Sequence, residues 1–360
     1  MHKPNAEIEI AGRKIGLDHP TYFIADIAAN HDGDFERAKE LIYLAAEAGA
    51  DVAKFQHFKA ETIVSDQGFS SLPKEQMSHQ AKWAKSVFEI YQDASIDPDW
   101  TPKLKEICDE AGITFFTTPY STDLVDTVDP YVPAYKIGSG DITWPQAISY
   151  IAGKGKPTIL AAGASTMDDV VRGVDACLAV NPDTILLQCN TNYTGDWENF
   201  RYVQLNVLKS FAAMYPGMIL GLSDHTPGHA AVLGAVTLGG RVIEKHFTDD
   251  NDREGPDHKF ALNPVAWRDM VDRTRELELA LGDGIKKIED NERDTVVIQR
   301  RGLRAAHDLD PGKPLGAGDI EALRPCPTDG IPPYMLEKLL GRELRRHLKR
   351  GDHFRWEDFE

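Results

Sequence analysis

Two histidines occupy similar settings, each at the end of a short apolar run. His225 lies in GLSDHT and His246 in IEKHFT. If the two runs are neighbouring parallel strands, both imidazoles lie on the same rim of a sheet. Neutral imidazole binds divalent transition metals well, and a metal held by only two side chains keeps positions for water and substrate. The motif is weak by itself, because two unrelated hydrogen-bonding histidines would show the same spacing.

A second group of residues is cationic or hydroxylic, and its members also stand at the ends of apolar runs. Lysines that point from successive strands toward one rim are costly to bury unless an anion meets them. Glycines beside a serine let the backbone approach a phosphate closely. These residue types favour an anion site, although either lysine alone could simply extend into solvent. The group consists of Lys54, Thr118, Lys136, Ser139 and Ser223.

A third group is acidic or polar and follows other apolar runs. Carboxylates and a phenol at a rim can hold sugar hydroxyls or handle protons, whereas Asp and Thr after strands are also ordinary helix caps. The group consists of Asp26, Asp141, Thr191, Tyr193 and Asp257. Arg324, in the proline-containing segment LRPCPTDGI, is either an anchor for a substrate oxygen or an ordinary surface arginine.

Eight short apolar runs are the elements that must position these side chains. Several are almost wholly apolar, as parallel strands buried on both faces should be. Eight such units with intervening helices predict a TIM barrel, and a doubly wound open sheet is the structural alternative. The barrel is favoured because polar residues follow the strands all around the series. The runs are 22–30, 51–56, 113–119, 134–140, 156–163, 183–191, 218–224 and 241–247.

Amphipathic stretches between the runs predict the helices. We expect helices at 35–50 and 102–112, and one that begins at the cap Asn263 and ends at Gly282. Between the fifth and sixth runs, one helical face would carry Val170, Val171, Val174, Cys177 and Leu178.

The pattern changes near residue 285. The charged segment KKIEDNERDTVV lacks a buried stripe and predicts a linker. We therefore expect a barrel domain at 1–285, a linker at 286–298 and a small domain at 299–360, with a helix at 334–341 in the last.

Composition excludes several classes of function. The chain has 360 residues and a net charge of −17, which disfavours nucleic-acid binding. An anionic substrate would therefore need a local group of cations. The four cysteines lie far apart and suggest reduced thiols in a cytoplasm. We expect no membrane span, because no apolar stretch reaches about 18 residues, and no export, because the N-terminus lacks a signal-like apolar core.

Taken together, the motifs resemble the sialic acid synthases. The similarity runs in order along nearly the whole chain and includes a tail that resembles their antifreeze-like domain. The segments that carry it include IADIAANHDGD, KFQHFKAE, TFFTTPY, YKIGSGDI, GLSDHT, IEKHFT, GPDHKFALNP and RGLRAAHDLDPGKPL.

The resemblance implies a fold, an activity and partners. The fold is a TIM barrel with an antifreeze-like domain, usually swapped across a homodimer. The activity is the condensation of phosphoenolpyruvate with an open-chain N-acetylmannosamine-like sugar to a nine-carbon 2-keto-3-deoxy acid. The metal is usually manganese, with magnesium or cobalt often able to replace it.

The resemblance also implies roles for individual residues. His225 and His246 correspond to metal ligands. The sugar contacts correspond to Tyr193, Asp257 and, from the other subunit, Arg324. Either the metal or Asp26 would position the water. The phosphoenolpyruvate contacts correspond to Lys54, Thr118, Lys136, Ser139 and Ser223.

The chain departs from the family pattern within the pocket. Family members usually carry Glu at Asp26 and Asp141, Ser at Ala161 and Asn at Thr191. Each acid is one methylene shorter, a change in reach of about 1.5 Å. We therefore expect a sugar other than plain N-acetylmannosamine: a related 2-acetamido, 2,4-diacetamido or non-amidated hexose.

Three alternatives remain at this stage. One is another phosphoenolpyruvate-condensing synthase, making eight-carbon or seven-carbon keto acids and usually needing a phosphorylated sugar. Another is a non-catalytic binding protein that lost turnover through the pocket changes. The third, a metal-dependent hydrolase, lacks an obvious third metal ligand.

Overall fold

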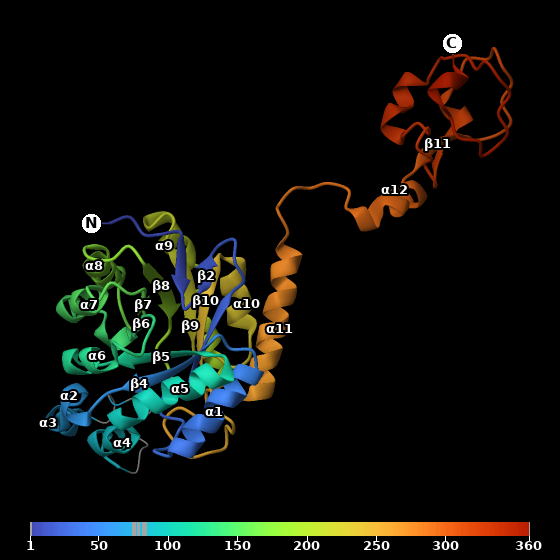
Figure 1. The fold of residues 1–360 in the computed structure, drawn as a ribbon. Coiled ribbons are helices and arrows are strands. Elements are labelled where there is room, and N and C mark those ends of the chain that lie inside the picture. The colour runs from blue at the N-terminus through green and yellow to red at the C-terminus, as the bar shows by residue number, and fades with distance from the viewer. Residues whose placement is uncertain (1, 74–76, 78–79, 81–84, 360) are drawn as a thin grey trace. The chain divides into compact units, whose positions relative to one another are not determined.

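The strands of the first part of the chain form a nearly closed parallel sheet. The computed structural model describes residues 2–73, 77, 80 and 85–359, and the chain divides into two compact units, 1–282 and 283–360. In the first unit the strand order is β5-β4-β3-β10-β9-β8-β7-β6, and hydrogen-bonded neighbours run parallel. β5 and β6, at the two ends of this order, also lie next to each other (Figure 1). The predicted TIM barrel is confirmed, and an open sheet is excluded.

Six of the eight barrel strands are shorter than the runs that predicted them, whereas β4 and β10 have the predicted length and are displaced by one residue. The strands are β3 (Tyr22–Asp26), β4 (Val52–His57), β5 (Thr114–Pro119), β6 (Tyr135–Ile137), β7 (Thr158–Ala161), β8 (Thr184–Cys189), β9 (Ile219–Asp224) and β10 (Gly240–His246).

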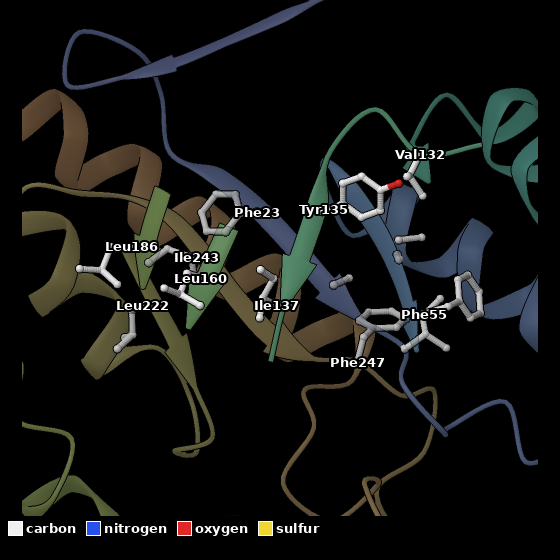
Figure 2. Packing of buried hydrophobic residues seen from close by; sticks show 14 of the residues in the cluster. Phe23, Phe55, Val132, Tyr135, Ile137, Leu160, Leu186, Leu222, Ile243 and Phe247 are labelled. Atoms are coloured by element: carbon white, nitrogen blue, oxygen red, sulfur yellow. The ribbon is translucent and has the colours of Figure 1, made fainter. Parts of the chain in front are cut away.

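Side chains alternate between the inside of the barrel and its helical shell. On β10, Val242 belongs to an inner apolar cluster, whereas Ile243 belongs to the outer cluster, part of which Figure 2 shows. Glu244 and His246 therefore share the inner face with Val242. On the other strands, too, apolar inner residues lie toward the N-terminal end and polar ones toward the C-terminal end, so the polar site rests on an apolar floor.

The helical shell follows the predicted pattern closely. α11 begins as expected, since the Asn263 side chain accepts a hydrogen bond from the Ala266 N–H and Pro264 takes the first helical position. The shell helices are α1 (Phe35–Glu47), α5 (Thr101–Ala111), α6 (Thr122–Val128), α7 (Pro145–Ala152), α8 (Met167–Leu178), α9 (Val207–Met214), α10 (Ala230–Thr237) and α11 (Pro264–Leu281).

The predicted face of α8 needs one correction. Val170, Val174, Cys177 and Leu178 are buried as expected, but Val171 is only half-buried and Gly173 takes the central place. A Cβ at Gly173 would lie 3.0 Å from the Ile142 side chain and 3.3 Å from that of Leu160. The helix therefore approaches the barrel through its glycine, and Val171 turns toward the edge of the contact.

Two features of the first unit were not predicted. A hairpin of β1 (Glu7–Ile10) and β2 (Arg13–Gly16) places Ile8, Ile10 and Ile15 in the inner apolar cluster, so it packs against the N-terminal end of the barrel. The connection from β4 to β5 carries short helices: α2 (Ala60–Ile63), α3 (Asp66–Ser71), α4 (Val87–Ala94) and the 3₁₀ turn η3 (Pro98–Trp100).

The second unit is built from short elements around its own apolar core. The predicted helix at 334–341 is instead a 3₁₀ helix, η8 (Pro333–Lys338), and Gly341 beyond it has a positive φ of 78°. The predicted linker segment contains η6 (Asp290–Glu292) and most of α12 (Arg293–Gln299), neither with a buried residue. The remaining elements are β11 (Gly302–Ala305), β12 (Ile320–Leu323), η7 (Ala317–Asp319) and η9 (Trp356–Asp358).

Only a long and predominantly apolar helix can cross a bilayer. Within the described ranges, none is both long and apolar enough to do so.

Candidate active site

A cavity of about 350 Å³ opens at the C-terminal ends of the barrel strands. Side chains of β3, β4, β5, β6, β8, β9 and β10 contribute to its lining, as expected for the active face of a TIM barrel. The predicted residues that line it are Asp26, Lys54, Thr118, Lys136, Ser139, Asp141, Thr191, Tyr193, Ser223, His225 and His246.

The two remaining predicted residues lie elsewhere. Asp257 lines an adjoining cavity of about 140 Å³, which shares Tyr193 and His246 with the first. Arg324 belongs to the second unit, where its side chain is exposed at the end of β12.

The two lysines of the cavity are met by carboxylates of the same cavity. Lys54 Nζ lies 2.6 Å from Asp26 Oδ2 and 3.7 Å from Glu244 Oε2. Lys136 Nζ lies 3.4 Å from Glu244 Oε1, which also accepts a hydrogen bond of 3.2 Å from the Ser223 hydroxyl. The two lysines do lie together in the cavity, but with both acids ionised their charges are neutralised.

Glu244 is the central residue that sequence reasoning missed. It lies two positions before His246 on β10, so strand alternation alone places both on the inner face. Gln56 shows the same relation to Lys54 on β4, and its amide donates to Asp26 Oδ2 at 3.1 Å. Period-two counting from the predicted residues would have found both.

The two shared carboxylates differ in acidity. Burial raises the pKa of Asp26, and the nearby Glu244 adds to this, so that the net shift is upward despite Lys54. Burial also acts on Glu244, but the flanking Lys136 and Lys54 outweigh it and hold its pKa below the usual value. Asp26 is therefore the carboxylate of the pair that takes up a proton more readily.

The two histidines lie close together within the cavity, with ring centroids 5.5 Å apart. His225 Nδ1 lies 2.9 Å from the Asn190 carbonyl, and the ring also interacts with Cys189. His246 Nδ1 is buried without a hydrogen-bond partner in the described part of the chain. Burial, together with neighbouring cations, holds the pKa of His246 well below its usual value. Burial opposes the charge of His225 too, but hydrogen bonding with Cys189 outweighs it and raises the pKa.

The lowered pKa and the unpartnered nitrogen of His246 fit a metal ligand, whereas the raised pKa of His225 means that a metal there would have to displace a proton. A metal binds deprotonated ring nitrogens, and one of the two histidines already carries an unpartnered buried nitrogen. Across residues 2–73, 77, 80 and 85–359, no three His, Cys, Asp or Glu side chains form a set that could hold a metal ion. A structural four-ligand site is therefore excluded for these residues, and an open two-histidine site remains.

Ser139 lies in a tight backbone cradle. It begins the 3₁₀ turn η4 (Ser139–Asp141), and its hydroxyl accepts a 3.0 Å hydrogen bond from the Gly163 N–H. A Cβ at Gly163 would lie 1.9 Å from Thr191 Oγ1 and 2.7 Å from Ser139 Oγ. Only glycine fits there, so β7, β8 and η4 can bring Thr191 and Ser139 together.

Asp141 and Tyr193 line the main cavity, and Asp257 lines the adjoining one. Burial, reinforced by Asp26, raises the pKa of Asp257 to about 6. Burial likewise raises the pKa of Asp141 despite Lys136. The Tyr193 ring packs edge-on against His225, with centroids 4.7 Å apart. Two polar groups, Tyr193 and Asp257, thus lie beside the histidines.

A buried ion pair in the barrel wall joins the strands that carry the histidines. Lys245 Nζ lies 2.5 Å from Asp224 Oδ2 and donates to the Thr226 carbonyl at 2.6 Å. Each residue is adjacent in sequence to a histidine, and both side chains point away from the cavity. The pair therefore ties the ends of β9 and β10 together behind His225 and His246.

Comparison with known proteins places both units. A model described as NeuB family matches residues 41–286, and one described as SAF domain matches residues 300–360. An uncharacterised protein of Methanocaldococcus jannaschii is 33% identical over 355 residues, 98% of each chain. The N,N'-diacetyllegionaminic acid synthase of Legionella pneumophila is 31% identical over 352 residues, 96% of each chain.

A solved structure resembles the chain as well. The N-acetylneuraminic acid (sialic acid) synthetase of Leptospira borgpetersenii aligns with a TM-score of 0.70 and 26% identity, covering 82% of this chain and 97% of that one. The similarity therefore concerns the three-dimensional structure as well as the sequence.

Proposed function

Because the chain belongs to the NeuB family, we propose that it is an enzyme that condenses phosphoenolpyruvate with an open-chain N-acetylmannosamine-like amino sugar. The products are a nine-carbon 2-keto-3-deoxy acid and phosphate. One observation carries the proposal: two lysines, hydroxyl groups and two histidines converge in one cavity at the C-terminal face of the barrel. Another phosphoenolpyruvate-condensing synthase shares this chemistry but usually needs a phosphorylated sugar.

Lys54 and Lys136 bind the carboxylate and phosphate of phosphoenolpyruvate in this proposal. Thr118, Ser139 and Ser223 supply hydrogen bonds to the remaining oxygens. Their convergence in one cavity, from β4, β5, β6, η4 and β9, supports this assignment.

Charge balance supports a divalent metal in the same cavity. Asp26 and Glu244 already neutralise the two lysines, so the charges of phosphoenolpyruvate call for a further cation. His225 and His246 would hold it, with Mn²⁺ preferred and Mg²⁺ or Co²⁺ as substitutes. When bound, such an ion supplies Lewis-acid polarisation of the sugar aldehyde.

The reaction proceeds through carbon–carbon bond formation. C3 of phosphoenolpyruvate attacks the aldehyde carbon, whose oxygen takes a proton and becomes a hydroxyl. Water adds at C2, where positive charge develops, and gives up a proton. Asp26, the more readily protonated carboxylate, is the group that we assign to this proton. The tetrahedral intermediate then loses phosphate by C–O cleavage and leaves the 2-keto group.

In this proposal the acceptor sugar binds next to Tyr193, Asp141 and Asp257. The adjoining cavity is also lined by apolar and aromatic side chains, among them Phe58, Ile90, Tyr91, Ala94 and Tyr120. Such a lining suits the methyl groups of acetamido substituents better than it suits hydroxyls.

A test of reaction class and substrate uses phosphate release from phosphoenolpyruvate with Mn²⁺ and a panel of free and phosphorylated sugars. We expect release that requires both sugar and metal and stops with a chelator. A 2,4-diacetamido hexose should exceed N-acetylmannosamine in kcat/KM by about 10-fold or more, as one well-placed apolar group can give.

The other outcomes of this assay are equally informative. A preference for N-acetylmannosamine over every alternative would contradict the diacetamido assignment. A requirement for a phosphorylated sugar would favour the eight-carbon or seven-carbon synthases. Stabilisation by phosphoenolpyruvate without any phosphate release would favour a binding protein.

We also propose a homodimer in which Arg324 of one protomer completes the acceptor site of the other. Exposed apolar side chains recur along residues 279–298 and suit burial against a second copy. They are Leu279, Leu281, Ile285, Ile288 and Ile298. A mixture of an Arg324→Ala variant with a His225→Ala variant should then recover part of the activity that each lacks alone. A monomer in sedimentation, or no recovery on mixing, would contradict the swapped arrangement.

The state of the cysteines fits a reducing compartment such as the cytoplasm, which we propose as the location. Cys108, Cys177, Cys189 and Cys326 are all free thiols.

A further inference from the structure

The loop between β10 and α11 is built around a buried histidine. His258 is fully buried, and both of its ring nitrogens are engaged: Nδ1 lies 2.7 Å from Thr248 Oγ1, and Nε2 lies 2.9 Å from Asp32 Oδ1. Thr248 begins the same loop, whereas Asp32 belongs to the loop after β3. The imidazole therefore ties the β10 loop to itself and to a neighbouring loop.

The Asp32 end of this link is held firmly. Its carboxylate lies 2.8 Å from Arg253 Nη2 and 3.2 Å from Arg37 Nε. Its backbone has a φ of 54°, in the left-handed region that residues other than glycine rarely adopt. Such a conformation persists where surrounding contacts enforce it. The Asp32 carboxylate that contacts His258 is therefore fixed in place.

The loop also closes tightly around His258. A Cβ at Gly255 would lie 2.6 Å from His258 Cδ2, so the chain passes directly over the ring. The Asn251 amide donates to the carbonyls of His258 at 2.9 Å and Ala261 at 2.8 Å. The backbone on both sides of the ring is thereby fixed.

What this arrangement holds is the preceding residue, Asp257. Its Oδ2 accepts a 3.4 Å hydrogen bond from the Ala29 N–H and lies 3.8 Å from His246 Nδ1. An ordinary core histidine would pack against apolar neighbours, whereas His258 connects polar groups of two loops directly beside a pocket carboxylate.

We propose that His258 is a positioning residue that fixes Asp257 at the acceptor side of the cavity through the chain Asp32–His258–Thr248. The assignment rests on the proposed function, since that assigns Asp257 to the acceptor. Phosphoenolpyruvate is held by Lys54 and Lys136 on β4 and β6, which this loop does not carry. Loss of the link therefore affects the acceptor and spares phosphoenolpyruvate.

The test compares His258→Ala, His258→Gln, His258→Asn and Asp32→Asn with the full-length wild type. Gln can retain the contact to Asp32, and Asn that to Thr248, so each should recover part of what His258→Ala loses. We expect His258→Ala to raise the acceptor KM by on the order of 100-fold, as a displacement of about 1 Å can, with the KM for phosphoenolpyruvate unchanged. Asp32→Asn should shift the acceptor KM in the same direction while leaving the loop sequence intact.

A matched control is Asn181→Ala. Asn181 is also buried, and its amide donates to the carbonyls of Ala152 and Lys156 at 3.2 and 2.7 Å, away from the cavity. Asn181→Ala should lower the melting temperature without raising the acceptor KM relative to the KM for phosphoenolpyruvate. Equal rises of both KM values in folded His258 variants, or no rise, would overturn the positioning role.

A readout independent of turnover separates this inference from the proposed function. Crystal structures of His258→Ala and Asp32→Asn should show Asp257 displaced from the Ala29 N–H. If Asp257 stays in place, the inference fails even where the enzyme is active. If Asp257 moves but the wild type releases no phosphate with any sugar, the positioning role of His258 stands and the proposed function fails.

Discussion

Alanine at both His225 and His246 is expected to lower turnover by about 1,000-fold or more, because Lewis-acid stabilisation contributes several kcal/mol and each 1.36 kcal/mol is tenfold. The fold should survive, since both side chains face an existing cavity. The double variant also loses the hydrogen bond between His225 and the Asn190 carbonyl, which contributes about 1 kcal/mol to the free energy of unfolding. Phosphate release measures turnover, the amount of bound Mn²⁺ measures metal binding, and circular dichroism measures whether the fold is retained.

A suitable control is His229→Ala, outside the cavity. His229 precedes α10 and lies 3.2 Å from Asp269 on α11, partly exposed. This variant should keep both metal binding and turnover. Metal-stimulated turnover that persists in the His225/His246 double variant would rule out the two-histidine metal site.

Replacement of Lys136 by Met is expected to act on substrate binding and on stability together. Loss of a charge-assisted hydrogen bond of about 1.5–3 kcal/mol predicts a rise in the phosphoenolpyruvate KM of roughly 10- to 150-fold. The variant also removes the closer lysine from the buried Glu244, which keeps the Ser223 hydroxyl and Lys54, at 3.7 Å. Breaking a buried pair in this way costs about 3–5 kcal/mol. Urea unfolding and steady-state kinetics measure the two effects separately.

A second substitution separates these effects. Adding Glu244→Gln to Lys136→Met removes the unpaired charge, so it should restore much of the stability without restoring phosphoenolpyruvate binding. Lys245→Met is the matched control, because Lys245 is another buried, ion-paired lysine but points away from the cavity. It should lose stability with no change in the phosphoenolpyruvate KM. An unchanged KM in Lys136→Met would show that this lysine does not bind the substrate.

Much of the fold follows from local patterns. β8 is buried throughout its length and reads TILLQC, which only a strand covered on both faces accommodates. The α11 cap at Asn263 and Pro264 was likewise readable, because a cap needs only neighbouring residues. The hairpin of β1 and β2 was missed because its buried side is three residues, Ile8, Ile10 and Ile15, too few for a distinct pattern.

The candidate site was predictable where residue type and strand end coincide. Lys54, Lys136, His225 and His246 each stand at the end of an apolar run, and the barrel brings the ends of parallel strands to one rim. Glu244 could have been predicted by the same reasoning, because it lies two residues before His246 on the same face of β10. The residues adjacent to it in the sequence, however, do not indicate which lysines it pairs with.

By itself, then, the sequence determined the eight strands, the face on which each side chain lies and the residue types at the rim, since these depend on spacing along one segment. Only the tertiary structure decided the pairings between segments: that Glu244 neutralises Lys136, and that His258 meets Asp32 across 226 positions of sequence. The physical reason is that burial and charge balance depend on which strands and loops become neighbours, and closure of the barrel fixes this.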